Sequence, residues 1–390
     1  MPRTATSVSY QNEDRFVVLT TSSHATAETA AMRRALEIAR RGEGRVEPNP
    51  LVGAVVIGAD GHIIAEGWHD HFGGPHAEAV ALAAAGDRAR GATLVVTLEP
   101  CCHHGKQPPC TAAILAAGIA RVVVAAGDPF PAVAGRGLAA LRAAGIDVAT
   151  GLLEPDALRL TAPFRKLVTT GTPWVIAKWA ATRDGRLVAP PGGDRWISSA
   201  ESRAVVHALR ARIDAIAVGS GTALADDPLL TARPAGPRPL LRVVLDGRGR
   251  LPVTSRLVRT AREAPLLVAV GREASDDRVA QLAAAGCEIW IAPDGTPAGR
   301  MRGLLSELGR RRLTNLLVEG GPTVFATLFA AGLADEVWEF VAPTAAGDSP
   351  APHDPPPARP PLDIEDVSHP GGDTLTRGLV RRPTSSAGRG

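Results

Sequence analysis

Residues 97–110, TLEPCCHHGKQPPC, decide the fold of the first half of this chain, together with His76-Ala77-Glu78 upstream. The segment leaves a strand-like run, crosses a loop and enters a helix-like run. One imidazole and two thiolates leave the fourth tetrahedral position of a zinc ion open, as a catalytic zinc requires in order to activate water. A carboxylate two residues beyond the histidine lies beside such a metal without ligating it and transfers protons. The pattern therefore predicts one zinc ion per chain, held by His76, Cys101 and Cys110, with Glu78 as the catalytic acid and base of a nucleobase deaminase.

The same motif admits other interpretations. The usual deaminase pattern is H-x-E followed by P-C-x-x-C, whereas eight residues separate Cys101 from Cys110 here. Cys102 is a second candidate ligand, but directly after Cys101 its side chain is expected to point away from the same metal. The same residues could also be a surface histidine and two small core cysteines without a metal. Because the histidine, the cysteines and the carboxylate all occur at strand-to-helix junctions, we favour the metal site. The histidines at 69, 71, 103 and 104 are expected to contact substrate or support the site rather than to ligate zinc.

Length and composition restrict the class of protein. A chain of 390 residues with 45 % hydrophobic and 21 % charged residues is typical of a globular protein of two domains. The net charge of +3 gives no electrostatic argument for a nucleic-acid or membrane partner. Of four cysteines, three fall within ten residues, which favours metal chemistry in a reducing compartment over a disulfide scaffold. The sequence has no apolar run long enough to cross a bilayer and no signal-peptide core, and so predicts a cytoplasmic protein.

The first half reads as one domain. Residues 1–25 are polar and aperiodic and are expected to form a flexible extension. Helix-like and strand-like runs then alternate and predict a compact α/β sandwich over residues 26–150. The expected helices cover 26–41, 76–85 and 110–117, and the expected strands cover 52–58, 63–67, 93–99 and 121–127.

The second half alternates strand and helix again, which predicts a mostly parallel sheet covered on both faces. A proline-rich segment at 350–361 reads as a loop or an insertion before a last strand at 374–380. The other expected strands cover 173–181, 214–219, 240–246, 266–270, 288–292, 314–319 and 336–342, and the expected helices cover 199–212, 275–285, 300–310 and 323–331.

Several of these segments resemble the bifunctional riboflavin biosynthesis deaminase/reductases, the RibD family. In the first half the resemblance rests on PNPLVG at 48–53, GWH at 67–69, PHAE at 75–78, TLEPC at 97–101 and the long loop HHGK with PPC before the second cysteine. It implies a cytidine-deaminase-like three-layer sandwich. By position, it implies that Asn49, His69 and Lys106 contact the pyrimidine or its phosphoribosyl group.

In the second half the resemblance rests on KWAATRDGR at 178–186, WISS at 196–199, GT with LADDP at 221–228 and VEGGPT at 318–323. It implies a dihydrofolate-reductase-like α/β domain over residues 171–383 that uses NADPH. The last motif also has its own physical logic, because glycines at a strand end let the backbone approach a pyrophosphate at a helix N-terminus. Arg183, Asp194 and Gly247 depart from the pattern of the family.

The resemblance also implies roles for individual residues of the second half. Lys178 stands out by itself, because this chain has only three lysines and keeps one inside an apolar strand. Arg210 and Arg233 are candidates for the substrate phosphate, which favours guanidinium groups. The implied substrate contacts are Lys178, Arg210, Leu230, Arg233 and Glu319, and the implied cofactor contacts are Ala180, Trp196, Thr222, Asp226, Gly321, Pro322 and Thr323.

The implied function is a two-step pathway enzyme that takes a small pyrimidine nucleotide-like substrate. The first half deaminates 2,5-diamino-6-(5-phosphoribosylamino)pyrimidin-4-one, and the second reduces 5-amino-6-(5-phosphoribosylamino)uracil with NADPH to the ribitylamino product. Three alternatives remain at this point: a deaminase with a degenerate reductase domain, another zinc nucleobase deaminase such as one acting on tRNA, and a non-catalytic zinc protein. An aromatic content of 4 % disfavours the tRNA enzyme. A homo-oligomer is left open.

Overall fold

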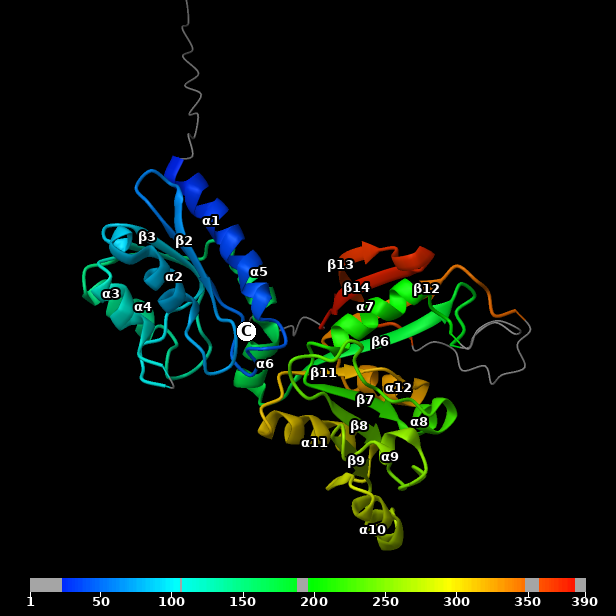
Figure 1. Ribbon diagram of the computed structural model, residues 1–390. Coiled ribbons are helices and arrows are strands. Elements are labelled where there is room, and N and C mark those ends of the chain that lie inside the picture. Colours follow the sequence, from blue (N-terminus) through cyan, green and yellow to red (C-terminus); the bar gives the residue numbers. More distant parts are fainter. Residues whose placement is uncertain (1–22, 106, 188–195, 348–357, 383–390) are drawn as a thin grey trace, which may run out of the picture.

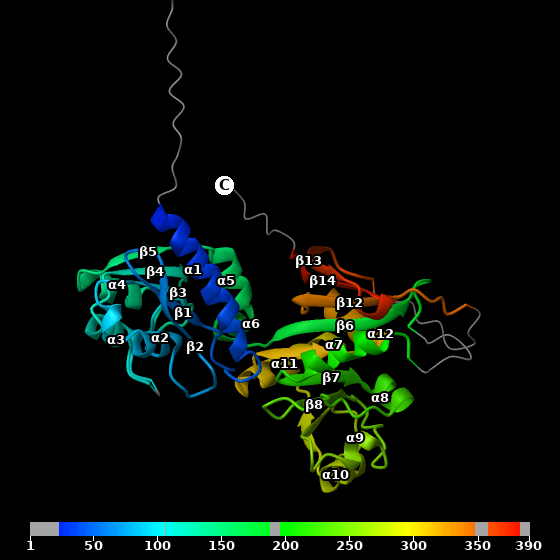
Figure 2. The ribbon, with the colours of Figure 1, turned by 45° about the horizontal axis from the view of Figure 1, so that its top comes forward.

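A computed structural model describes residues 23–105, 107–187, 196–347 and 358–382. The described strands form two sheets, one of five strands in the first half of the chain and one of nine strands in the second half. Figure 1 shows two lobes with helix α6 (Ala162–Thr170) at their junction, and Figure 2 shows the same arrangement from a second direction. Lys106, Asp194 and part of the proline-rich segment lie outside the described residues.

The first sheet lies between two layers of helices. Its strands are β1 (Gly53–Ile57), β2 (Ile63–Trp68), β3 (Thr93–Leu98), β4 (Arg121–Ala126) and β5 (Asp147–Thr150), and its helices are α1 (Ser23–Ala39), α2 (Ala77–Ala85), α3 (Cys110–Ala116), α4 (Arg136–Ala143) and α5 (Glu154–Leu160). The strand order is β2-β1-β3-β4-β5, antiparallel on both sides of β1 and parallel from β3 to β5. Val56 and Val96 pack with α2, α3 and α4, whereas Val55 and Val95 pack with α1 and α5. The predicted three-layer sandwich is confirmed.

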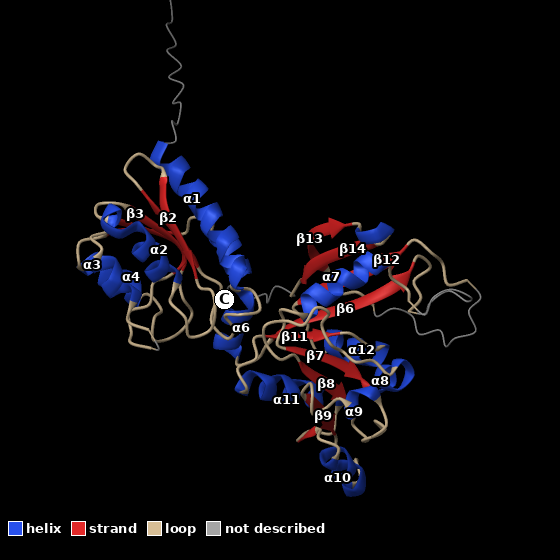
Figure 3. Cartoon of the chain, in the orientation of Figure 1, coloured by secondary structure: helices blue, strands red, loops and turns tan. Residues whose placement is uncertain are grey.

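The second sheet is also covered on both faces (Figure 3). Its strands are β6 (Trp174–Thr182), β7 (Ala215–Gly219), β8 (Leu241–Leu245), β9 (Leu266–Val270), β10 (Glu288–Ile291), β11 (Asn315–Val318), β12 (Glu336–Ala342), β13 (Leu362–Ser368) and β14 (Thr374–Val380). The order is β10-β9-β8-β7-β11-β6-β12-β14-β13, parallel as far as β12 and antiparallel beyond it. The mostly parallel sheet predicted for this half is confirmed.

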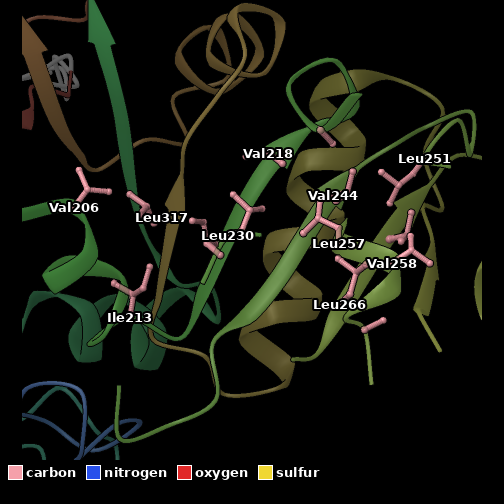
Figure 4. Close-up of a cluster of buried hydrophobic side chains, with 14 of the residues drawn as sticks. Val206, Ile213, Val218, Leu230, Val244, Leu251, Leu257, Val258, Leu266 and Leu317 are labelled. Carbon is pink, nitrogen blue, oxygen red and sulfur yellow. The ribbon is translucent and has the colours of Figure 1, made fainter. Parts of the chain in front are cut away.

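The helices of the second half are α7 (Ala200–Arg210), α8 (Ser220–Asp226), α9 (Arg256–Arg259), α10 (Asp276–Ala284), α11 (Pro297–Arg310) and α12 (Pro322–Ala330). One face of the sheet packs against α7, α9 and α10, and Figure 4 shows part of this core, including Val218, Val244 and Leu266. The opposite face packs against α11 and α12. Because consecutive residues of a strand point to opposite faces, strands between the two cores, such as β7 and β9, are apolar throughout.

The structure adds elements that the sequence analysis did not predict: β5, β13, α4, α5, α6, α8 and α9. Helix α1 begins at Ser23, so the last positions of the expected extension 1–25 are helical, and the rest of it lies outside the described residues. Helices α5 and α6 follow the expected first domain: α5 packs against β4 and α1, and α6 contacts β6. The division into 26–150 and 171–383 stays a prediction.

Residues 43–47 are a part of the first half that contacts the second half directly. Arg212 forms an ion pair with Glu43 at 2.6 Å. Arg238 donates a hydrogen bond from Nε to the carbonyl oxygen of Gly44 at 2.6 Å and forms an ion pair with Glu47 at 3.1 Å. These contacts dock the second sheet beside the loop that leads into β1.

Candidate active sites

The three residues predicted to hold zinc converge at the carboxyl end of β3. The ligand atoms of His76, Cys101 and Cys110 all lie within 4.8 Å of one another. Nδ1 of His76 lies 3.2 Å from Sγ of Cys110 and 3.5 Å from Sγ of Cys101. Nitrogen and sulfur ligands of a tetrahedral zinc ion are separated by about 3.6 Å when the bonds have their usual lengths. The donor set and its spacing therefore fit zinc.

The local fold explains this convergence. His76 precedes the first turn of α2, and Gly67 of β2 lets that helix approach, because a Cβ at Gly67 would meet the carbonyl oxygen of Ala77 at 2.4 Å. Cys101 follows β3, and Cys110 begins α3. The backbone N–H of Cys110 donates to Sγ of Cys101 at 3.3 Å. The side-chain hydrogen bond between the two thiols lowers the pKa of Cys101 and raises that of Cys110, so Cys101 is the first of the two to form a thiolate.

Cys102 does not join the cluster. Its sulfur lies 3.8 Å from the carbonyl oxygen of Ala132, which is consistent with the expectation that it points away from the metal. His69, His71, His103 and His104 also lie outside the cluster. Of these, His69 contacts a ligand residue, because its ring packs edge-on against that of His76 with ring centroids 5.5 Å apart.

Glu78 lies beside the cluster in the first turn of α2 and is only 4 % exposed. Burial raises the pKa of its carboxyl group above the ordinary value, and the His76 imidazole partly offsets this effect. A raised pKa brings a carboxyl group closer to the range in which it can both accept and release a proton, as acid–base catalysis requires.

His69 and Asn49 form a second polar pair in the same region. Nδ1 of His69 lies 2.9 Å from the carbonyl oxygen of Pro75, so this nitrogen donates and carries the proton. The other ring nitrogen then accepts a hydrogen bond from Nδ2 of Asn49 at 3.0 Å. Burial lowers the pKa of His69, in agreement with a neutral ring. This pair fixes the amide of Asn49 at the edge of the site.

Glu99 is a site residue that the sequence analysis missed. It is 4 % exposed and accepts four backbone hydrogen bonds at 3.0 to 3.3 Å, from the N–H groups of residues 128, 135, 137 and 138. These contacts tie the loop after β4 to the end of β3, next to Cys101. The sequence around Glu99 gives little indication of this role, because all four N–H donors lie 29 or more positions downstream.

A cavity of about 910 Å³ opens over this cluster. Of the predicted residues, Asn49, His69, His76, Glu78 and Cys101 line it, and Cys110 lies behind them in a buried position. Lys106, the remaining predicted contact, lies outside the described residues.

A second cavity, of about 1030 Å³, lies in the second half. Such a volume is at the upper end of the usual range for ligand pockets, so it accommodates a substrate together with part of a cofactor. All of the residues predicted for this half line it except Thr323: Lys178, Ala180, Trp196, Arg210, Thr222, Asp226, Leu230, Arg233, Glu319, Gly321 and Pro322. Arg183 and Gly247, two departures from the family pattern, do not line it.

Three charged residues meet at the floor of the second cavity. Arg210 donates to both carboxylate oxygens of Glu319, at 2.8 and 2.6 Å, and to the carbonyl oxygen of Thr231 at 3.1 Å. Against the effect of burial, Arg210 lowers the pKa of Glu319. Lys178 lies over the ring of Phe340 at 5.4 Å, and burial lowers its pKa. Arg210 thus holds Glu319, and the guanidinium of Arg233, near His207 at 3.1 Å, lies on the exposed side.

Glycines shape the opposite wall of the second cavity. Gly320 has a φ of +134°, which side chains other than glycine rarely adopt, and a Cβ at Gly321 would meet Oγ1 of Thr222 at 3.0 Å. The carbonyl oxygen of Gly320 accepts a hydrogen bond from the N–H of Gly219 at 2.9 Å. Helix α12 begins at Pro322 beside this turn. A glycine turn before a helix N-terminus fits the phosphates of a dinucleotide such as NADPH.

Comparison with known families and proteins agrees with both sites. Residues 25–126 match the family described as the cytidine and deoxycytidylate deaminase zinc-binding region, and residues 173–376 match the RibD C-terminal domain family. The chain is 40 % identical over 319 residues to "Riboflavin biosynthesis protein RibD" of Aquifex aeolicus, covering 81 % of this chain and 87 % of that protein. It is 40 % identical over 329 residues to the protein of the same name from Escherichia coli, covering 81 % and 88 %.

Solved structures resemble the whole fold. RibD of Acinetobacter baumannii superimposes with a TM-score of 0.77 at 34 % identity, covering 92 % of this chain and 99 % of that one. A diaminohydroxyphosphoribosylaminopyrimidine deaminase/5-amino-6-(5-phosphoribosylamino)uracil reductase of Thermotoga maritima gives a TM-score of 0.76 at 36 % identity, covering 91 % and 99 %. In the part of the chain that the structure describes, no helix is long and apolar enough to cross a membrane.

Proposed function

This chain belongs to the RibD family of riboflavin biosynthesis proteins, and on that premise we propose that it catalyses two consecutive reactions in two separate cavities. The first is the deamination of 2,5-diamino-6-(5-phosphoribosylamino)pyrimidin-4-one. The second is the NADPH-dependent reduction of the resulting 5-amino-6-(5-phosphoribosylamino)uracil. The observation that carries the proposal is the convergence of His76, Cys101 and Cys110 beside the buried carboxyl group of Glu78.

In the first cavity, His76, Cys101 and Cys110 hold the metal, and Glu78 moves the protons. Bound zinc supplies Lewis-acid activation of water. The carboxylate of Glu78 takes a proton from the water whose oxygen bonds to C2 of the pyrimidine and delivers it to the 2-amino group, whose bond to C2 then breaks to release ammonia. Asn49, fixed by His69, contacts the pyrimidine through its amide. Lys106 is assigned to the phosphoribosyl group.

In the second cavity, Lys178 and Glu319 orient the ring-opened sugar. Bound NADPH supplies a hydride to C1′ of that sugar. We assign its binding to the wall around Gly321, Pro322 and Thr323 and to Ala180, Trp196, Thr222 and Asp226. Leu230 and Arg233 complete the substrate contacts. Arg210 acts mainly through Glu319, because both of that carboxylate's oxygens accept hydrogen bonds from its guanidinium group.

The proposal extends to location and assembly. All four cysteines are free, as a cytoplasmic, reducing environment would keep them. A homo-oligomer is supported by edge strand β13, on which Ile364 and Val367 are 50 % and 52 % exposed, because edge strands with apolar side chains favour association. Light scattering of the purified protein measures the oligomeric state.

The reaction itself tests the proposal. We expect zinc-loaded protein, given the diaminopyrimidine phosphate and NADPH, to release ammonia first and to oxidise NADPH afterwards. Ammonia release without NADPH oxidation, also when the deaminated uracil is supplied directly, would reduce the proposal to a deaminase. Absence of both signals would contradict it.

A further inference from the structure

The cavity over the zinc-ligand cluster is not built from the first sheet alone. Most of its lining residues belong to the segment before β1, the start of α2 and the loops that follow β2, β3 and β4. Leu167 and Val168 come from α6, and Gly309 and Arg312 come from the end of α11 and the turn that follows it. One wall of the first cavity therefore belongs to the half of the chain that carries the second cavity.

Close backbone contact fixes this wall in place. A Cβ at Gly309 would meet the carbonyl oxygen of Gly171 at 1.7 Å, so α11 and the turn after α6 approach at a distance that only glycine permits. Farther along the same junction, Arg212 pairs with Glu43, and Arg238 donates to the carbonyl oxygen of Gly44. The position of Arg312 relative to the first cavity is thus set by several independent contacts.

Arg312 itself is held by its backbone and not by its side chain. Its φ is +62°, and its N–H donates to the carbonyl oxygen of Gly309 at 2.8 Å. The side chain is exposed and, within the described residues, makes no hydrogen bond or ion pair. Its neighbours differ, because Arg310 pairs with Glu307, and Arg311 pairs with Glu307 and Glu288.

We propose that Arg312 binds the 5′-phosphate of the substrate in the first cavity, so that the second half of the chain completes the deaminase site. The inference rests on the proposed function, which gives that substrate a phosphate group. Among the described lining residues Arg312 is the one arginine or lysine, whereas Glu78, Glu99 and Asp128 carry the acidic groups. A guanidinium group binds phosphate through paired, charge-assisted hydrogen bonds, and a carboxylate repels it.

The test compares phosphorylated and dephosphorylated diaminopyrimidine as substrates of the full-length, zinc-loaded protein. We expect Arg312→Ala to raise KM for the phosphorylated compound by about tenfold or more and to leave kcat nearly unchanged, because the contact is made equally before and during the reaction. KM for the dephosphorylated riboside should not change. Arg312→Lys should recover part of the loss, since it keeps the charge. The matched control is Arg310→Ala, which removes an arginine that does not line the cavity.

The assignment of Arg312 to the phosphate can be refuted by several results. An unchanged KM, an equal loss with both substrates, or a fall in kcat alone would overturn the assignment. A wild-type protein that deaminates neither compound would instead contradict the proposed function. Calorimetric titration with the phosphorylated pyrimidine would then still decide the inference, because Arg312→Ala should weaken binding by about tenfold or more, and equal affinity in both proteins would refute it.

Discussion

At the residue scale, the proposed deaminase site separates metal binding from proton transfer. His76, Cys101 and Cys110 supply one ligand atom each, whereas Glu78 lies beside them with a buried carboxyl group. The sequence motif predicted that these four residues act together, because one histidine, two cysteines and a carboxylate occur at strand-to-helix junctions, and the structure brings the three ligand residues together. It could not show why the histidine nearby is not a ligand: His69 uses one nitrogen on Pro75 and the other on Asn49.

Replacing Glu78 with glutamine tests its role as acid and base. The amide keeps the shape of the side chain but cannot transfer the proton, so we expect zinc to remain bound while deamination falls by at least ~100-fold. Metal analysis and the rate of ammonia release measure the two properties on the same sample. Normal deamination by this variant would show that Glu78 does not transfer the proton.

Serine substitutions test the ligand set. We expect Cys101→Ser and Cys110→Ser to abolish stoichiometric zinc binding and Cys102→Ser to retain about one zinc per chain. Cys102 is the internal control, because it adjoins Cys101 but its sulfur faces the carbonyl oxygen of Ala132. Loss of zinc from the Cys102 variant alone would show that the ligand assignment is wrong.

At the element scale, strands with a fully buried apolar run could be predicted and edge elements could not. The bounds of β9 were predicted to the residue, and all five of its positions are buried. Strand β13 was missed because it alternates acidic residues with exposed apolar ones and lies at the edge of the sheet, where its strand partner is β14. Contacts between distant segments leave no local signal: Arg210 was predicted to face substrate, and its pairing with Glu319, 109 positions away, was not foreseen.

Glu99 fixes a loop rather than a helix or strand. Glu99→Ala leaves four backbone N–H groups without their acceptor, and hydrogen bonds to a charged group contribute roughly 1.5–3 kcal/mol each. We expect a stability loss of at least about 2 kcal/mol and weaker deamination, because the loop it anchors, including Asp128 and Phe130, lines the first cavity. Thermal unfolding and KM measure these effects. Glu37→Ala, which changes an exposed side chain of α1, is the control, and an equal response from both variants would contradict the anchoring role.

At the scale of the whole molecule, the junction between the two halves contains an acid, Glu47, whose side chain is only 11 % exposed. Burial raises the pKa of Glu47 from 4.5 to about 7, and the Arg238 charge partly offsets this effect. The folded protein therefore keeps a proton that the unfolded chain loses at lower pH. The stabilisation is complete below about pH 4.5 and is lost as pH rises through about 7.

Glu47→Gln removes this titration. We expect the stability of the wild type, relative to the variant, to fall between about pH 4.5 and about pH 7 by an amount on the order of 3 kcal/mol at most. Thermal unfolding of both proteins at a series of pH values gives the difference directly. A difference that does not depend on pH would mean that Glu47 keeps an ordinary pKa at the junction.

The central claim is that one chain carries two catalytic sites that act in sequence but independently of each other. The most direct test measures NADPH oxidation by the Glu78→Gln protein supplied with the deaminated uracil phosphate. The zinc-site residues all precede residue 111, whereas Lys178 and Glu319 line the other cavity. We predict NADPH oxidation at the wild-type rate, while Lys178→Ala protein deaminates normally but fails to oxidise NADPH. If wild-type and Glu78→Gln proteins that bind zinc oxidise no NADPH on this substrate, the second cavity is not a reductase site and the claim of two activities fails.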